Sequence, residues 1–350
     1  MAERILEVKQ LRKVFPVRAG VLGFFHKERR RSIIAVDRLN FDVLRGEILG
    51  IVGESGCGKT TTGRILVGVE KPSEGQVLFK GQDRFRKEDK DVRKKLNREI
   101  QLIFQDPYAC LSPWLTVGEL LAEPLWINRL TTTKEDESQK VQDVMRLVGL
   151  SDIETFSPKY PHELSGGQRQ RVVIARALML QPEFLVADEP VSMVDVSTRL
   201  GILNVFLELR EKRRISCVYI THDLASSRYM CDRVAVMYLG KMVEIGSTDD
   251  VIYSPLHPYT KALIAAVPTP NPRIRRPEIA IKGEVQTLVD VPLGCRFHPR
   301  CLYAKEKCSS EEPELRGLGE NHLVACHFAE ELGLEASSKR KHTPTRNSVI

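Results

Sequence analysis

The chain has 350 residues, of which 42% are hydrophobic and 28% charged, enough for one large globular domain and a smaller second one. No run approaches the roughly 18 apolar residues that span a bilayer, and the first ten residues lack a signal-peptide core, so we expect a soluble, cytoplasmic protein. The net charge of +7 suits nucleic acid, membrane headgroups or a nucleotide. In a reducing cytosol, the eight cysteines favour metal ligation or core filling over disulfides.

The first predicted elements are strands. Residues 1 to about 85 carry alternating apolar and polar side chains before Phe15 and after Asn40. They are predicted to form antiparallel strands and the core that holds the glycine-rich loop described next. The basic stretch that follows Phe15 is expected to form an exposed loop.

A glycine-rich loop follows a short predicted strand of apolar residues. It fits the pattern G-x-x-x-x-G-K-[ST], with Gly53, Gly58, Lys59 and Thr60 on the fixed positions. Glycines let backbone N–H groups wrap a phosphate, and the helix that begins near Lys59 adds its positive end. Lys59 is expected to reach the outer phosphates, and the Thr60 hydroxyl to hold magnesium. The loop therefore predicts a nucleoside triphosphate site.

A charged segment over about 86–160 is predicted to be helical. After it, Ser165, Gly166 and Gly167 offer unobstructed backbone donors at the start of a helix whose apolar stripe continues over 172–180. This is a second phosphate-binding helix terminus in a chain that already has one.

A buried parallel strand is predicted over 184–187, where four apolar residues lead into an acidic pair. Ligands of open α/β sheets gather at the carboxyl ends of the strands. Asp188 is therefore expected to hold the magnesium shell, and Glu189 to polarise an attacking water as general base.

The rest of the chain predicts a hairpin and a short helix. Alternation over 233–246 favours a hairpin that turns at Leu239, Gly240 and Lys241. Residues 260–267 favour a short amphipathic helix. The polar tail beyond about 332 is expected to be disordered.

Four cysteines near the C-terminus are separated by five, six and 17 residues: Cys295, Cys301, Cys308 and Cys326. Four thiolates suit an iron–sulfur cluster or tetrahedral zinc, although the absence of a C-x2-C pair is unlike ordinary zinc ribbons. Reduced structural thiols or disulfides are the third interpretation, and His298, His322 and His327 are close enough in sequence to replace a cysteine as ligand. The ligand set is expected to pin a small, loop-rich domain.

The segment Leu164 to Gln168, LSGGQ, resembles the signature of ATP-binding cassette (ABC) ATPases. In that family, the signature of one subunit closes over ATP held by the P-loop of its partner. One P-loop and one signature in this chain imply a dimer of cassettes with two shared sites. The implied fold is α/β, with a P-loop NTPase (RecA-like) core, an antiparallel β subdomain, a helical subdomain and a small cysteine-ligated C-terminal domain.

Other positions match motifs of the same family. Gln105 stands where the Q-loop glutamine contacts magnesium and the membrane partner, and His222 where the switch histidine touches the γ-phosphate. Phe15 stands where an aromatic ring stacks on adenine, with a core phenylalanine as the alternative. The resemblance thus makes Glu189, His222 and Gln105 the catalytic residues. It implies nucleotide contacts from Phe15, Gly53, Ser55, Gly56, Cys57, Gly58, Lys59, Thr60, Thr61, Asp188, Ser165, Gly166, Gly167, Gln168 and Asp195, and magnesium ligands from Thr60, Gln105 and Asp188.

Two motifs depart from the family pattern. The D-loop keeps Ser192 and Asp195 but places the bulkier Met193 and Val194 at the expected dimer seam. Thr60 replaces the commoner serine, which keeps the hydroxyl.

Residues 254–268 resemble the segment after the cassette in peptide-importer ATPases, which serve oligopeptide, dipeptide and nickel uptake. In this group, the motifs GCRFHPRC and VACH recur with a [4Fe-4S] cluster, which the resemblance implies for the four cysteines, with zinc as the alternative. The expected domains are an ABC cassette over 1–253, with its helical subdomain over about 86–165, a C-terminal domain over 254–331 and a tail over 332–350.

The resemblance implies an ATPase, with ATP and Mg²⁺ as further cofactors, that lies peripherally on the cytoplasmic face of the cell membrane and energises an importer. Its expected partners are two transmembrane permease subunits, an extracellular solute-binding protein and a second, homologous ABC ATPase, with a homodimer as the fallback. The cargo, whether peptide, nickel or oligosaccharide, stays open. The alternative, a soluble ABC ATPase that acts on nucleic acid or ribosomes, rests on the positive charge alone, so no nucleic acid is expected.

Overall fold

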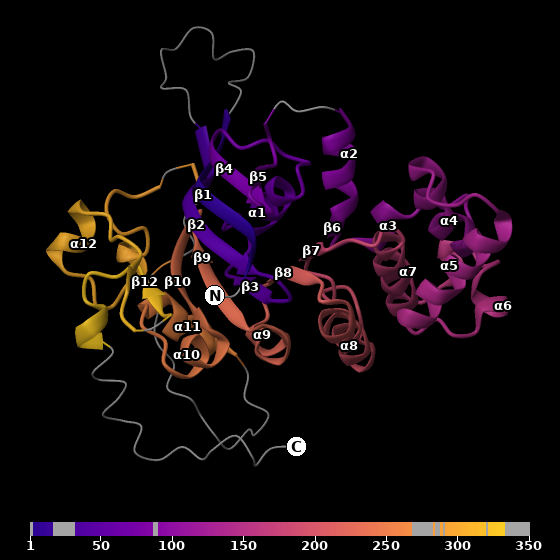
Figure 1. Cartoon of the computed structure of the whole chain (residues 1–350). Coiled ribbons are helices and arrows are strands. Elements are labelled where there is room, and N and C mark those ends of the chain that lie inside the picture. Colours follow the sequence, from indigo (N-terminus) through magenta and orange to yellow (C-terminus); the bar gives the residue numbers. More distant parts are fainter. Residues whose placement is uncertain are drawn as a thin grey trace, which may run out of the picture. The chain divides into compact units, whose positions relative to one another are not determined.

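The structure is a computed structural model that describes residues 3–16, 32–86, 90–267, 283, 288–289, 291–319 and 321–332. Its contacts divide the chain into two compact units, whose elements are labelled in Figure 1. The first unit comprises Met1–Leu11, Asn40–Leu49 and Thr60–Thr221, and the second comprises Arg12–Leu39, Gly50–Lys59 and His222–Ile350. Three strands contribute residues to both units: β1 (Arg4–Pro16), β2 (Ser32–Leu44) and β3 (Ile48–Val52).

The first unit contains a parallel sheet in which β7 (Phe184–Asp188) lies between β6 (Ile100–Ile103) and β8 (Ser216–Thr221). Val186 of β7 is in register with Leu102 and Val218. Every residue of β7 and β8 is buried, as is typical of parallel strands covered on both faces. The strand predicted over 184–187 is thus confirmed.

β6 corrects the expectation that about 86–160 is helical throughout. The helix α2 (Lys90–Glu99) ends where β6 begins, and Ile100 and Ile103 of β6 are both buried. Four residues are too few to show a period of their own inside a charged segment. The pairing with β7, which the local sequence does not contain, makes this segment a strand.

A second, smaller sheet has the strand order β2-β1-β4-β5, and β4 and β5 belong to the first unit. β4 (Glu74–Phe79) and β5 (Gln82–Asp83) pair in the antiparallel sense, as expected for this part of the chain. The backbone N–H of Lys80 donates to the carbonyl of Ile5 and joins this hairpin to β1.

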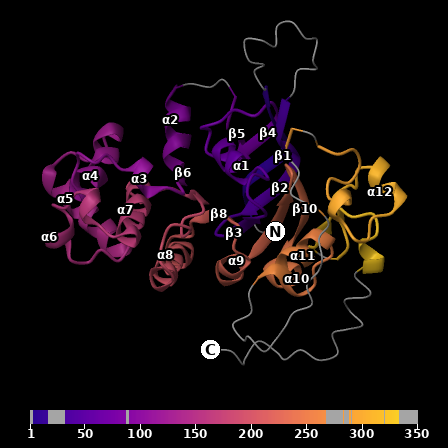
Figure 2. The ribbon, with the colours of Figure 1, turned by 180° about the vertical axis from the view of Figure 1, so that it is seen from behind.

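The helices of the first unit gather into a bundle over α3 to α7, which Figures 1 and 2 show from opposite sides. α7 packs against α3, α4 and α5. These bundle helices, together with α1 and α8 outside the bundle, have the following bounds: α1 (Lys59–Leu66), α3 (Pro107–Cys110), α4 (Val117–Asn128), α5 (Lys134–Leu147), α6 (Ile153–Phe156), the 3-10 helix η2 (Pro161–Glu163), α7 (Gly166–Leu178) and α8 (Val196–Arg213).

The second unit is built on the hairpin of β9 (Arg233–Tyr238) and β10 (Lys241–Ser247), which confirms the predicted turn. Tyr238 pairs with Lys241, and both residues between them have positive φ, 42° at Leu239 and 79° at Gly240. This backbone matches the right-handed twist of a two-residue hairpin. The sheet continues through β12 (Leu323–Val324) to β11 (Arg316–Gly317).

Short helices complete the second unit: α9 (Leu224–Met230), α10 (Thr248–Tyr253), α11 (Pro258–Ala266), the 3-10 helix η3 (His298–Arg300) and α12 (Glu306–Ser310). α11 confirms the helix predicted over 260–267. The basic stretch after Phe15 and the tail beyond 332 lie outside the described residues. Within the part of the chain that the structure describes, the helices are too short or too polar to cross a membrane.

Candidate active site

The P-loop, residues 53–60, runs from the end of β3 into α1. The Lys59 ammonium donates to the carbonyl oxygens of Gly53 at 2.7 Å and of Glu54 at 2.9 Å. A Cβ on Gly58, where φ is +107°, would lie 2.1 Å from the Ala35 carbonyl oxygen. The fixed glycine is therefore required by both backbone conformation and space, and the loop folds tightly around the lysine amine.

Thr60 and Asp188 meet in the first unit. The Thr60 hydroxyl lies 3.2 Å from a carboxylate oxygen of Asp188, which is buried at the end of β7. A hydroxyl and a carboxylate side by side are hard oxygen ligands of the kind that Mg²⁺ prefers. The two magnesium ligands predicted from separate motifs thus come together.

Gln105 and Glu189 also meet in this unit, at the ends of β6 and β7. The Gln105 amide donates to a carboxylate oxygen of Glu189 at 2.9 Å. Glu189 has a φ of +47°, which is unfavourable for a side-chain-bearing residue. Its N–H donates to the Ile220 carbonyl at 2.9 Å and so holds that backbone. Both residues were predicted as catalytic residues, but nothing in the sequence predicts the hydrogen bond between them.

The signature forms the start of α7. Ser165 is the N-cap and exchanges hydrogen bonds with Gln168, which completes a capping box. A Cβ on Gly167 would lie 2.4 Å from the Thr198 side chain of α8, so a glycine is needed where the two helices approach each other. The helix terminus predicted from Ser165, Gly166 and Gly167 is present, with an exposed Ser165.

The D-loop corrects one expectation about the dimer seam. Met193 is 54% exposed, but Val194 is only 5% exposed and packs inside the unit. Asp195 caps α8 and accepts hydrogen bonds from Ser197 and Thr198, which lower the pKa of its carboxyl to about 2. Of the two bulky residues, only Met193 is available to a partner.

Two further predicted contacts, His222 and Phe15, lie in the second unit. His222 is exposed directly after β8, and the next residue, Asp223, caps α9. Phe15 is half-buried near the end of β1, with the Lys13 ammonium 4.8 Å from its ring centroid. Both remain predictions for the switch histidine and the adenine platform.

The expected metal centre is not formed. The four cysteines line one cavity of about 20 Å³, and none of the cysteines in the described residues forms a disulfide. However, across the described ranges no group of three or more His, Cys, Asp and Glu side chains is arranged to hold a metal ion. The predicted iron–sulfur cluster, and zinc in its place, are therefore wrong.

The physical reason lies in the placement of the side chains, because among the described residues no three of them are brought into a metal-binding arrangement. Burial raises the pKa of Cys295 to about 12 and that of Cys326 to about 11. With these pKa values, both side chains are neutral thiols at neutral pH. Sequence spacing counted four possible ligands but did not place their sulfur atoms.

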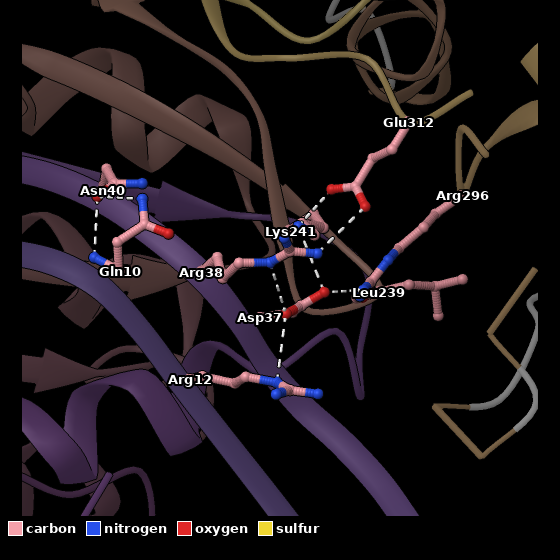
Figure 3. A network of polar contacts seen from close by, with 9 residues as sticks. All are labelled: Gln10, Arg12, Asp37, Arg38, Asn40, Leu239, Lys241, Arg296 and Glu312. Atoms are coloured by element: carbon pink, nitrogen blue, oxygen red, sulfur yellow. Dashed lines mark hydrogen bonds and ion pairs between the residues drawn. The ribbon is translucent and has the colours of Figure 1, made fainter. Parts of the chain in front are cut away.

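Two arginines of the GCRFHPRC motif, Arg296 and Arg300, anchor the segment that carries the cysteines. The sequence-based expectations do not include them. Arg296 pairs with Asp37 of β2 and donates to the Leu239 carbonyl (Figure 3). Arg300 pairs with Glu54 of the P-loop. Both guanidiniums are buried, and a buried charge requires a partner. Nothing in the sequence shows which arginines are buried, so it held no signal for these pairs.

Comparison with known proteins gives consistent similarities. The family described as ABC transporter matches residues 36–192, and the family described as oligopeptide/dipeptide transporter, C-terminal region, matches residues 243–308. The oligopeptide transport ATP-binding protein AppF of Bacillus subtilis is 44% identical over 93% of this chain and 98% of its own length. The dipeptide transport ATP-binding protein DppF of Escherichia coli is 41% identical over 93% of this chain and 95% of its own length.

A solved structure is similar over a smaller part. The dimeric structure of the bacterial ABC transporter cassette MJ0796 aligns with a TM-score of 0.60 and 28% identity, and covers 69% of this chain and 98% of that one.

Proposed function

This chain belongs to the ATP-binding proteins of oligopeptide and dipeptide ABC transporters and is an ATPase, and we propose that it energises the import of peptides or related solutes. The contact of Gln105 with Glu189, beside the Thr60 and Asp188 pair of the same unit, carries the proposal. Relatives with transport names support the importer over an ATPase that acts on nucleic acid.

In the proposed reaction, the P-loop N–H groups and Lys59 bind the phosphates of ATP. Thr60 and Asp188 would hold Mg²⁺, which neutralises charge on the phosphate oxygens when bound. Glu189 accepts the proton of the attacking water, and Gln105 fixes the Glu189 carboxylate for that task through the 2.9 Å hydrogen bond. ATP-driven closure of two cassettes and reopening after hydrolysis would drive the membrane subunits.

The proposed partners are two permease subunits, an extracellular solute-binding protein and a second, different ABC ATPase, with the chain held at the cytoplasmic face of the membrane. A groove of about 250 Å³ in the first unit supports permease docking. It is lined on one side by Gln101 and Phe104, which lead to Gln105, and on the other by α4 residues including Ile127. Phe104 and Ile127 are 40% and 66% exposed, as is common at interaction sites.

We also propose the division into a cassette (1–253), a C-terminal region (254–331) and a tail (332–350). The C-terminal family match over residues 243–308 supports a C-terminal region, and it begins within the last residues of the proposed cassette.

Two substitutions test this function. We expect Glu189→Gln to keep ATP affinity and lose at least about 100-fold in turnover, because the amide cannot take up the proton. Lys59→Ala is expected to lose about 100-fold in ATP affinity, because a charged donor to the phosphates is removed. Steady-state hydrolysis and binding of a fluorescent ATP analogue measure the two effects. Parental turnover in Glu189→Gln would exclude the general base, and parental affinity in Lys59→Ala would exclude the P-loop assignment.

A further inference from the structure

Glu54 is a P-loop residue whose side chain has no part in the proposed chemistry. Its carboxylate forms a two-point ion pair with Arg300, at 2.9 Å from Nη1 to Oε2 and 3.2 Å from Nη2 to Oε1. The two residues are 246 positions apart in the chain and lie in the same unit. Paired hydrogen bonds from a planar guanidinium fix orientation as well as distance. The region after residue 253 therefore holds a side chain of the P-loop directly.

The backbone of Glu54 is held from the same side. Its N–H donates to the Tyr259 hydroxyl at 2.9 Å. Its carbonyl accepts from the Lys59 ammonium at 2.9 Å. Glu54 thus connects two residues of the C-terminal region to the lysine that is proposed to bind the outer phosphates.

An aromatic cluster makes this support rigid. Tyr238, Tyr259 and Phe297 are all buried, and their ring centroids lie 4.6 to 5.4 Å apart. Arg300 donates to the Tyr238 hydroxyl at 3.3 Å. Because these rings are fixed by close packing, the Tyr259 hydroxyl and the Arg300 guanidinium present fixed positions to Glu54.

The Arg300 guanidinium keeps its positive charge. Burial lowers the pKa of Arg300, but hydrogen bonds to Glu54 and Tyr238 raise it by more, so the net direction is upward. Loss of the guanidinium would leave a partly buried carboxylate without its main partner inside the phosphate loop, which is costly.

We propose that Arg300 and Tyr259 are positioning residues for ATP binding, which act through Glu54 to hold the P-loop and Lys59 in the binding conformation. The inference rests on the proposed nucleotide role of the P-loop. By thermodynamic reciprocity, ATP then stabilises the docking of the C-terminal region to the same extent that this docking improves ATP affinity. The C-terminal region is in this way part of the nucleotide site and more than an appended module.

A double-mutant cycle on the ion pair tests the proposal. Arg300→Met keeps length and removes the charge, and Glu54→Gln keeps shape and removes the charge. Each single variant is expected to raise the dissociation constant for the fluorescent ATP analogue about tenfold. The dissociation constant of the double variant is expected not to exceed the larger of the two single-variant values, because both changes remove one shared contact. Additive effects in the double variant would overturn the direct link.

Tyr259→Phe is a gentler variant, because it removes one hydroxyl from a buried ring. We expect a rise of about threefold in the same dissociation constant, since the Glu54 N–H loses its acceptor. An affinity equal to that of the parent in both Tyr259→Phe and Arg300→Met would overturn the proposal.

Arg296→Met is the matched control, because Arg296 is as buried as Arg300 but pairs with Asp37. It is expected to lower the melting temperature and to leave ATP affinity within twofold of the parent. If it weakens ATP binding as much as Arg300→Met does, the effect is general destabilisation and the proposal fails. Lys59→Ala tests the P-loop assignment separately from the positioning role. If Lys59→Ala keeps its ATP affinity, the P-loop assignment itself is wrong. If Lys59→Ala loses ATP affinity but Arg300→Met does not, only the positioning role is wrong.

Hydrogen exchange measures the reciprocal effect. Saturating ATP is expected to slow amide exchange over 295–301 in the parent, and to do so about tenfold less in Arg300→Met, in proportion to the lost coupling. Equal protection by ATP in both proteins would contradict the coupling.

Discussion

His257 is a fully buried histidine at the start of α11. Its ring Nδ1 accepts the backbone N–H of Tyr259 at 3.0 Å and caps the helix, and the backbone N–H of His257 donates to Glu244. Burial lowers the pKa of His257 from 6.5 to about 4, with Glu244 opposing this shift and Lys261 adding to it. The folded protein therefore keeps this ring neutral where the unfolded chain would protonate it.

This difference predicts an acid-sensitive stability. Between pH 6.5 and 4, the unfolded state binds a proton that the folded state does not, so the free energy of unfolding falls as the pH falls. The His257 contribution between pH 7.5 and pH 5 is expected to be about 2 kcal/mol. His257→Asn keeps a capping acceptor and should remove this part of the pH dependence in urea titrations. An unchanged dependence on pH in the variant would contradict the assignment.

For single residues, the sequence predicted the chemical role of a side chain better than it predicted which side chains meet. Lys59, Thr60 and Asp188 follow from motifs whose spacing is set by phosphate and magnesium chemistry, and Thr60 and Asp188 indeed meet. The pairing of Glu54 with Arg300 was not predictable, because it joins distant positions with no local pattern. The cysteines misled because ligand type and spacing do not report burial or sulfur geometry.

At the scale of elements, one carboxylate joins two strands and the C-terminal segment of the second unit. Asp37 of β2 is buried and faces Arg12, Arg38, Lys241 of β10 and Arg296, as Figure 3 shows. Burial raises the pKa of Asp37, but Lys241 and Arg296 lower it by more than burial raises it. The net pKa is therefore lowered, and the carboxylate stays ionised. Glu312 adds a second anion at the exposed side of Arg38 and Lys241.

Asp37→Asn is expected to destabilise the protein by about 3 kcal/mol, because it leaves several cations clustered around a neutral side chain. The control Glu312→Gln removes a carboxylate that is 44% exposed and should cost less than about 1 kcal/mol. Chemical denaturation of both variants measures the difference. Equal losses would show that the buried carboxylate does not organise these elements.

Elements with a clear period were predictable, and elements defined by their neighbours were not. The hairpin of β9 and β10 and the helix α11 follow from alternation, glycine and proline. β6 is a four-residue strand created by β7, and β11 and β12 are two-residue strands added to the edge at β10. Such pairings come from the tertiary structure and leave no periodic signal.

At the scale of the whole molecule, the first unit exposes an apolar face beside the signature. Val196 and Leu200 lie one turn apart on α8 and are 77% and 55% exposed, and Met193 just before them is 54% exposed. Residues four apart share a helix face, and exposed apolar side chains that cluster in this way are typical of protein interfaces. The face supports the proposed closure of two cassettes, in which the signature of each would approach the partner.

Glu189→Gln should trap the closed state, because it keeps ATP affinity and loses hydrolysis. Since the partner is proposed to be a different ATPase, we expect this variant alone to stay monomeric by light scattering with Mg²⁺ and ATP, and to form a one-to-one complex when mixed with the second ATPase of its transporter. Lys59→Ala should form no complex.

Adding Leu200→Glu to Glu189→Gln should weaken that complex at least about tenfold, because a charge would be buried in an apolar contact, while ATP binding by the single chain is kept. A doubled mass for Glu189→Gln alone would establish a homodimer in place of the heterodimer. If the complex keeps its affinity with Leu200→Glu, the α8 face does not belong to the interface. Burial of a carboxylate without a partner would cost enough free energy to weaken the complex.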